Sequence, residues 1–257
     1  MKYLKSIKIV GLFFVAIVII QMLISDAGSI YLQETMDALF KSVLLALVVL
    51  KYKISRKEIG LTKFNRNDSS FVIMFISLFT LSYLFFSHID WISYTVGSSV
   101  KPADIIFFYT LVPVGLLVSA VLEEVVFTKL ILLEQLKNEN PLRKILFVAV
   151  LFTLVHVPSS WFHFVFLMVG SIIFSYVALV TNTIRYTVFL HFLSNFLILF
   201  YVLFDNSDPL NQISWLQLTY NHSFWSIEAG GLLSLIATLI FFVYFITSFR
   251  KKLELQQ

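Results

Sequence analysis

Residues 119–132, SAVLEEVVFTKLIL, place two adjacent glutamates and a lysine in a stretch that is otherwise apolar enough for a membrane helix. A charged side chain near the centre of a bilayer costs about 2.5–3.5 kcal/mol even on lenient insertion scales. Charged residues that persist in such segments face the interior of a helix bundle and mark functional sites. Glu123 and Glu124 are therefore the first candidates for function.

The composition around this stretch predicts an all-α polytopic membrane protein. Of the 257 residues, 59% are hydrophobic and 13% are charged, whereas soluble domains carry about 25% charged residues. The apolar runs are continuous, unlike the short alternating segments of an outer-membrane barrel. A net charge of +4, concentrated in loops, does not indicate nucleic acid as a partner. Because cysteine is absent, disulfides, thiolate nucleophiles and cysteine-ligated metals are excluded.

About eight transmembrane spans are predicted within a single membrane domain, 1–257, whose motif-bearing core covers about 104–204. The spans are 7–24, 30–50, 70–88, 104–136, 144–158, 161–181, 185–204 and 229–249. All but three of the 19 Lys and Arg residues fall on one side of this arrangement, the exceptions being Lys41, Lys101 and Lys129. By the positive-inside rule both termini are cytoplasmic. The composition fits a multi-pass protein of a bacterial plasma membrane.

The second span carries charges of its own. Asp37 and Lys41 are four residues apart, so they share one face of a helix. We expect them to form an intrahelical ion pair that eases insertion into the membrane.

Polar residues on three of the spans can meet in one cavity. Adjacent helical residues differ by about 100° in direction, so one glutamate can face a cavity while the other reaches a supporting partner. His191 and Asn195 are four residues apart and share a face. At 1.5 Å per residue, Glu123 and His156 lie about 18–20 Å in from the basic side, and His191 about 9 Å in. The expected cavity is in the cytoplasmic half.

These groups suit hydrolysis by a general base. A carboxylate can take a proton from water, and a neutral imidazole can orient that water or ligate a metal. A second histidine with an asparagine can donate hydrogen bonds to an oxyanion. The H-E-x-x-H motif of zincins is absent. Singly, an intramembrane histidine or asparagine is usually an interhelical hydrogen bonder, and Lys129 could pair with the glutamates structurally. Their joint occurrence on three spans favours function.

The three segments EEVVF (123–127), FTLVH (152–156) and HFLSN (191–195) resemble the motifs of the CPBP family. This family comprises the CAAX-prenyl-protease and bacteriocin-processing intramembrane proteases, also called Abi proteins. Its pattern is E-E-x-x-x-R, then F-x-x-x-H, then H-x-x-x-N, on a core of eight membrane helices. The resemblance covers about residues 104–200, with the motifs in order.

The resemblance implies a cytoplasm-facing intramembrane endopeptidase that acts on a membrane-associated peptide or protein. It implies that Glu123 activates water with help from His156, and that His191 and Asn195 hold the oxyanion. Glu124 would be the supporting carboxylate.

The motif phenylalanine, Phe152, would be a supporting residue. No cofactor is expected. A divalent metal such as zinc stays open, with Glu123, His156 and His191 as its ligands.

The sequence departs from the family pattern at Thr128, where the motif has arginine, and at Lys129, where a small residue is usual. The Thr128 hydroxyl is placed to hydrogen-bond Glu124 one turn away but cannot neutralise it. Lys129 lies about 140° around an α-helix from Glu124, and we expect it to extend towards the cytoplasmic interface. This departure keeps a catalytically degraded binding or bacteriocin self-immunity protein as the alternative. A proton-coupled transporter is disfavoured because no internal repeat is found.

Overall fold

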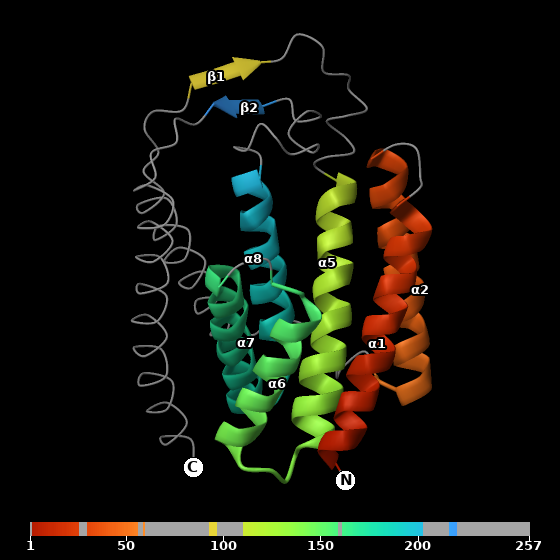
Figure 1. The fold of residues 1–257 in the computed structure, drawn as a ribbon, viewed down its shortest axis with the longest axis vertical. Helices are drawn as coiled ribbons and strands as arrows, with labels where there is room; N and C mark the ends of the chain where they lie inside the picture. The colour runs from red at the N-terminus through yellow and green to blue at the C-terminus, as the bar shows by residue number, and fades with distance from the viewer. Residues whose placement is uncertain are drawn as a thin grey trace.

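The computed structural model describes residues 2–25, 30–55, 59, 93–96, 110–158, 161–202 and 216–219. Its helices lie side by side along the long axis of the molecule (Figure 1). They are α1 (Lys2–Ser25), α2 (Ile30–Tyr52), α5 (Val112–Glu123), η2 (Glu124–Gln135), α6 (Pro141–Val155), α7 (Trp161–Thr181) and α8 (Arg185–Val202). This helical bundle agrees with the all-α prediction. The predicted spans 70–88 and 229–249 lie outside the described residues, and the extent of the single domain stays a prediction.

Two short strands are a feature that the span pattern does not predict. Strand β1 (Ser93–Val96) pairs antiparallel with β2 (Leu216–Thr219), with Ser93 opposite Thr219 and Val96 opposite Leu216. The ribbon lies at the end of the bundle away from the start of α1 (Figure 1). Four-residue runs are too short for hydrophobic periodicity to separate a strand from a loop.

The predicted span 104–136 is, in its described part, one continuous helix with two kinds of turn. α5 runs directly into η2, whose backbone is that of a π-helix. At its end the amide of Leu136 donates to the carbonyl of Ile131, five residues back, at 2.9 Å. Such wide turns are rare and occur frequently at functional sites. Glu123 is the last residue of α5 and Glu124 the first of η2.

Helix η2 lies at the centre of the core. Its Phe127 is 2% exposed and meets Phe13 of α1 and Phe152 of α6 edge to face, with ring centroids 5.8 and 5.3 Å apart. Val148 of α6 and Ala178 of α7 are buried in the same cluster. In lipid, helices associate through such close packing, because lipid tails are as apolar as the side chains. The packing fixes the direction of the helix that carries both glutamates.

Helix α6 begins with a capped turn. The Asn140 side chain accepts hydrogen bonds from the amides of Leu142 and Arg143, at 3.0 and 3.3 Å. Asn is among the best N-cap residues, and Pro141 occupies the first helical position, where its missing N–H is not needed. The helix therefore starts three residues before the predicted span 144–158.

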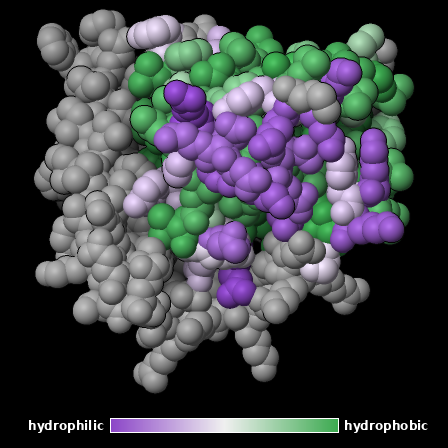
Figure 2. Space-filling view, turned by 90° about the horizontal axis from the view of Figure 1, so that it is seen from below, coloured by the Kyte–Doolittle hydropathy of each residue, from purple (hydrophilic) through white to green (hydrophobic). Residues whose placement is uncertain are grey.

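The outer faces of the bundle are apolar and one end is polar. Large hydrophobic side chains are exposed along α1 and α2, including Leu12, Met22 and Leu50. Seen from below, hydrophilic residues gather in a patch bordered by apolar ones (Figure 2). Among the described residues, α1 alone is long and apolar enough to cross a membrane, and Leu167–Thr181 is a shorter apolar helix. The number of spans and their orientation stay predictions.

At the lower end of the bundle, polar contacts join the start of α1 to the turn before α6. Lys2 Nζ lies 3.5 Å from Glu139 Oε1, and the Tyr3 hydroxyl donates to Glu139 Oε2 at 3.2 Å. These contacts tie the start of α1 to the turn between η2 and α6 (Figure 1). This is the end at which the sequence predicts the cytoplasm.

Candidate active site

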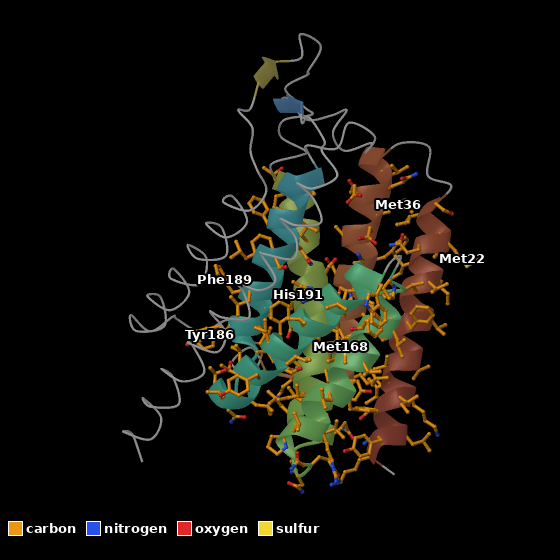
Figure 3. The ribbon with its side chains drawn as sticks, turned by 60° about the vertical axis from the view of Figure 1, so that its left-hand side comes forward. Met22, Met36, Met168, Tyr186, Phe189 and His191 are labelled. Atoms are coloured by element: carbon orange, nitrogen blue, oxygen red, sulfur yellow. The ribbon has the colours of Figure 1, made fainter. Side chains whose placement is uncertain are left out.

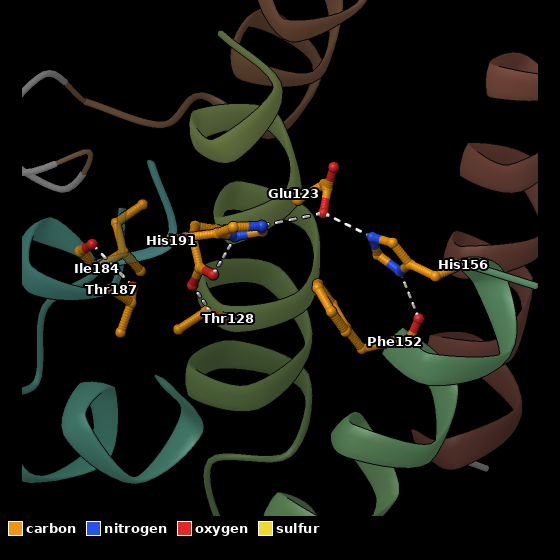
Figure 4. Close-up of polar contacts among 8 residues, drawn as sticks. Glu123, Thr128, Phe152, His156, Ile184, Thr187 and His191 are labelled. Atoms are coloured by element: carbon orange, nitrogen blue, oxygen red, sulfur yellow. Dashed lines mark hydrogen bonds and ion pairs between the residues drawn. The ribbon is translucent and has the colours of Figure 1, made fainter. Parts of the chain in front are cut away.

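Four of the predicted site residues meet between α5, η2, α6 and α8 (Figure 4). Oε2 of Glu123 lies 3.2 Å from Nε2 of His156 and 3.6 Å from Nε2 of His191. Nδ1 of His191 lies 3.0 Å from Oε1 of Glu124. The two adjacent glutamates thus share His191 as a neighbour, each through a different ring nitrogen.

This meeting corrects the depth estimated for His191 from its distance along the chain. Ile184, just before α8, is fully buried and packs with Val125 and Leu130 of η2. Helix α8 therefore begins inside the bundle, beside η2. The preceding turn includes Asn182 in the left-handed region (φ 48°), which asparagine tolerates well. Counting along a straight helix placed His191 too shallow because it assumed that α8 starts at the membrane surface.

His156 is oriented by the helix that it follows. Its Nδ1 lies 2.7 Å from the carbonyl oxygen of Phe152. Because a carbonyl only accepts, Nδ1 carries the hydrogen and Nε2 is turned towards Glu123. α6 ends at Val155, as the nearby Pro158 predicts. Val157 between them has φ 45°, a strained value for a β-branched residue. The imidazole therefore sits on a sharply terminated helix end.

Glu124 is a buried carboxylate with both oxygens in contact. Oε2 accepts a hydrogen bond from the Thr128 hydroxyl at 2.6 Å, which confirms the expected contact. Oε1 faces His191. Glu124, Thr128 and His191 are only 2%, 3% and 5% exposed. Lys129 points elsewhere, with its ammonium 3.2 Å from Glu134. Residues five apart come together here because η2 has wide turns.

Glu123 has a different environment. Its side chain and that of His156 keep 18% and 28% of their surface exposed. Its Oε2 atom is nevertheless buried and makes no hydrogen bond among the described residues. The Nε2 atoms of His156 and His191 lie within ion-pair distance of this oxygen. A buried oxygen that lacks a bond is rare in folded proteins and is compatible with a catalytic role.

Aromatic rings enclose both histidines. The Phe152 ring lies 4.2 Å from the His156 ring and 5.7 Å from the His191 ring, which fits its prediction as a supporting residue. Phe174 of α7 stacks on His191 at 5.4 Å. Phe174 was not predicted, because it lies outside the three motifs in an apolar helix rich in phenylalanine. His191 lies inside the bundle, whereas Met22 lies on its outer side (Figure 3).

Asn195 is less closely connected to the cluster than the other predicted site residues. Asn195 is half-buried one turn beyond His191 on α8. Within the described part of the chain, no hydrogen bond or ion pair joins it to the other four residues. Among the described residues, no three His, Asp or Glu side chains are arranged as a group that could hold a metal ion. The divalent metal with Glu123, His156 and His191 as its ligands stays a prediction.

Two glutamates and two histidines thus meet inside a helical bundle. Residues 105–197 match the family described as Type II CAAX prenyl endopeptidase Rce1-like. This match supports the resemblance to the CPBP family of intramembrane proteases, over the region that carries the three motifs. The family is membrane-embedded and its activity is that of a CAAX-protease-type endopeptidase. Comparisons with curated proteins and with solved structures found no match to the chain.

Proposed function

We propose that this protein is an intramembrane endopeptidase in which Glu123 activates water at a cytoplasm-facing site. One observation carries the proposal: a single carboxylate oxygen, Glu123 Oε2, faces the Nε2 atoms of both His156 and His191. Glu123 and His156 are also the more exposed members of the cluster. Part of each of these two side chains is therefore accessible, although Oε2 itself is buried, whereas Glu124 is enclosed.

In the proposed reaction Glu123 takes one proton from water as the water oxygen attacks the carbonyl carbon of the scissile peptide. His156 accepts a hydrogen bond from that water at Nε2, because its Nδ1 already donates to Phe152. The carbonyl π electrons move to oxygen and form the tetrahedral oxyanion. When the C–N bond breaks, the proton on Glu123 passes to the leaving amine. Glu123 is then an ionised carboxylate again.

We assign the oxyanion to His191, with Asn195 as its partner on the same face of α8. In this mechanism the Glu124 carboxylate accepts from Nδ1 of His191 and holds the ring in place. The Nε2–H of that ring is then the donor that stabilises the oxyanion. The Thr128 hydrogen bond fixes Glu124 in turn.

The proposed substrate is a membrane-associated peptide or protein, cleaved next to the cytoplasmic surface of a bacterial plasma membrane. The apolar exposed faces of α1 and α2 fit a bilayer as the surrounding phase. The proposed mechanism uses no metal and no organic cofactor.

The test compares membrane peptides, by mass spectrometry, between cells that express the wild type and cells that express Glu123→Ala. We expect uncleaved peptides to accumulate in the variant, and Glu134→Gln, a change at a more exposed glutamate, to leave the profile as in the wild type. Identical profiles for wild type and Glu123→Ala would exclude the proposed activity. If the Glu123→Ala protein still gave its host protection against a bacteriocin, the binding or self-immunity alternative would be favoured.

A further inference from the structure

The orientation of His191 depends on residues of other helices. Two ion pairs in the bundle form within single helices: Lys41 Nζ lies 2.6 Å from Asp37 Oδ2, which confirms the predicted pair, and Lys129 Nζ lies 3.2 Å from Glu134 Oε1. His191 on α8 instead meets carboxylates of α5 and η2 and aromatic rings of α6 and α7. The direction of its ring is therefore set by how these helices pack.

The two carboxylates hold the His191 ring at its edge. Nδ1 lies 3.0 Å from Oε1 of Glu124, and Nε2 lies 3.6 Å from Oε2 of Glu123. Hydrogen bonds tolerate some misalignment, and the χ2 torsion of a histidine side chain is broad. Contacts at the two nitrogens alone therefore leave the plane of the ring loosely defined.

The face of the His191 ring is covered by Phe174 of α7. The two rings are stacked, with centroids 5.4 Å apart and planes 27° apart. Phe152 meets the same imidazole at 65°, in an edge contact with centroids 5.7 Å apart. Aromatic pairs at these separations favour such stacked and edge-to-face arrangements. Because Phe174 lies against the face, it restrains the tilt that the carboxylates leave open.

Phe174 is itself held by a closely packed part of α7. Its neighbours in the chain, Ile173 and Ser175, are 4% and 1% exposed. Ala178, one turn further along, is fully buried in the same core cluster as Phe152. A stack on a helix that is fixed on both sides can hold its partner ring in one plane.

The plane of the His191 ring matters for the proposed reaction. The Nε2–H bond lies in that plane, so a tilt of the ring turns the proposed donor away from the oxyanion. Donors of this kind act only when they are placed about 2.7–3.1 Å from the position that the oxyanion will occupy. Small misplacements at a reacting centre can reduce the rate by large factors.

We propose that Phe174 is a positioning residue of the active site, which fixes the plane of the His191 ring so that its Nε2–H points at the oxyanion. This inference rests on the proposed peptidase function. The alternative is that Phe174 only fills space between helices, as an apolar side chain in an apolar helix usually does. The two readings differ in what happens when the ring is replaced by an apolar chain of similar size.

The experiment uses the full chain in lipid vesicles and a synthetic copy of one peptide that accumulates with Glu123→Ala. The constants kcat and KM are measured for Phe174→Leu, Phe174→Met and Phe174→Tyr, together with thermal unfolding. Phe164→Leu is the matched control, because Phe164 lies on the same helix and stacks on Trp161 with centroids 5.2 Å apart.

We expect Phe174→Leu and Phe174→Met to lower kcat by about tenfold, the upper end of what one aromatic pair supplies. KM should stay unchanged, because the lost interaction is one made in the transition state. Phe174→Tyr keeps the ring and should keep kcat close to that of the wild type. Phe164→Leu should leave both constants as in the wild type, even where thermal unfolding falls.

Wild-type kcat in Phe174→Leu and Phe174→Met would show that Phe174 only fills space, and the inference would be wrong. A raised KM with unchanged kcat would also overturn it, since Phe174 would then act on substrate binding. Should Phe174→Leu fail to insert, Phe174→Met decides, because its flexible side chain fills the space without a ring. If Glu123→Ala membranes match the wild type, the proposed function fails. If they differ while Phe174→Leu behaves as the wild type, this inference alone fails.

Discussion

Glu124 holds His191 through the contact between Oε1 and Nδ1 at 3.0 Å, in a part of the bundle where both residues are almost fully buried. Removal of one partner from a buried charged pair costs about 3–5 kcal/mol, because the other is left uncompensated. We expect Glu124→Ala to lower the stability of the purified protein by that amount and to abolish cleavage. Thermal unfolding in detergent measures the first effect. Unchanged unfolding would show that Glu124 does not support the fold.

The Thr128 hydroxyl is the hydrogen-bond partner of the other Glu124 oxygen. Thr128→Val keeps the shape but leaves Oε2 of Glu124 without the 2.6 Å hydrogen bond. A buried acceptor that loses its donor costs about 1–3 kcal/mol. We expect that loss for valine and a smaller one for serine, which keeps the hydroxyl. Equal stability of the valine and serine variants would contradict a role for this hydrogen bond.

Installing the motif residue is a separate test. Thr128 is 3% exposed, so Thr128→Arg must insert a much larger side chain into a packed region. We expect a loss of about 1–3 kcal/mol from overpacking and no gain in cleavage rate. A variant that is more stable and more active than the wild type would show that the core has room for a guanidinium beside Glu124.

Phe152 packs against both histidine rings and against Phe127. Phe152→Ala should lower the free energy of unfolding by about 3–5 kcal/mol through the cavity that it creates. Cleavage should fall because both histidine rings lose a packing partner. Leu154→Ala is a control on the same helix, with a side chain that is 58% exposed. Changes at such exposed positions are usually within about 0.5 kcal/mol. Similar losses in both variants would argue against the packing role.

The Asn195→Ala variant tests catalysis separately from stability. Since no hydrogen bond or ion pair joins it to the cluster within the described residues, Asn195→Ala should leave thermal unfolding unchanged. As the proposed oxyanion partner it should still lower the cleavage rate, by about 10²–10³-fold for loss of one such donor. A variant with wild-type cleavage would remove Asn195 from the proposed mechanism. Loss of stability with normal chemistry would make it a packing residue.

The sequence was sufficient to predict the helices that the structure describes and most of the cluster. Continuous apolar runs predict membrane helices, and the predicted span 161–181 coincides with α7. Glu123, Glu124, His156 and His191 were recognisable because polar residues are few in such segments. The contact between Thr128 and Glu124 followed from their spacing of four residues.

Other features depend on packing that the sequence does not reveal. The stacking of Phe174 on His191 needs the relative rotation of α7 and α8. The level of His191 needs the buried turn at Ile184. In each case the partners come from different helices, so no spacing along the chain indicates them.

Because of the wide turns of η2, the number of residues in this segment is a stricter constraint than the identity of each residue. Loss of the Thr128 hydroxyl removes one hydrogen bond, the one to Glu124. Deletion of a single residue between Glu124 and Gln135 would instead change the register of every side chain beyond it, including the pairing of Lys129 with Glu134. The segment should therefore tolerate substitutions more readily than insertions or deletions.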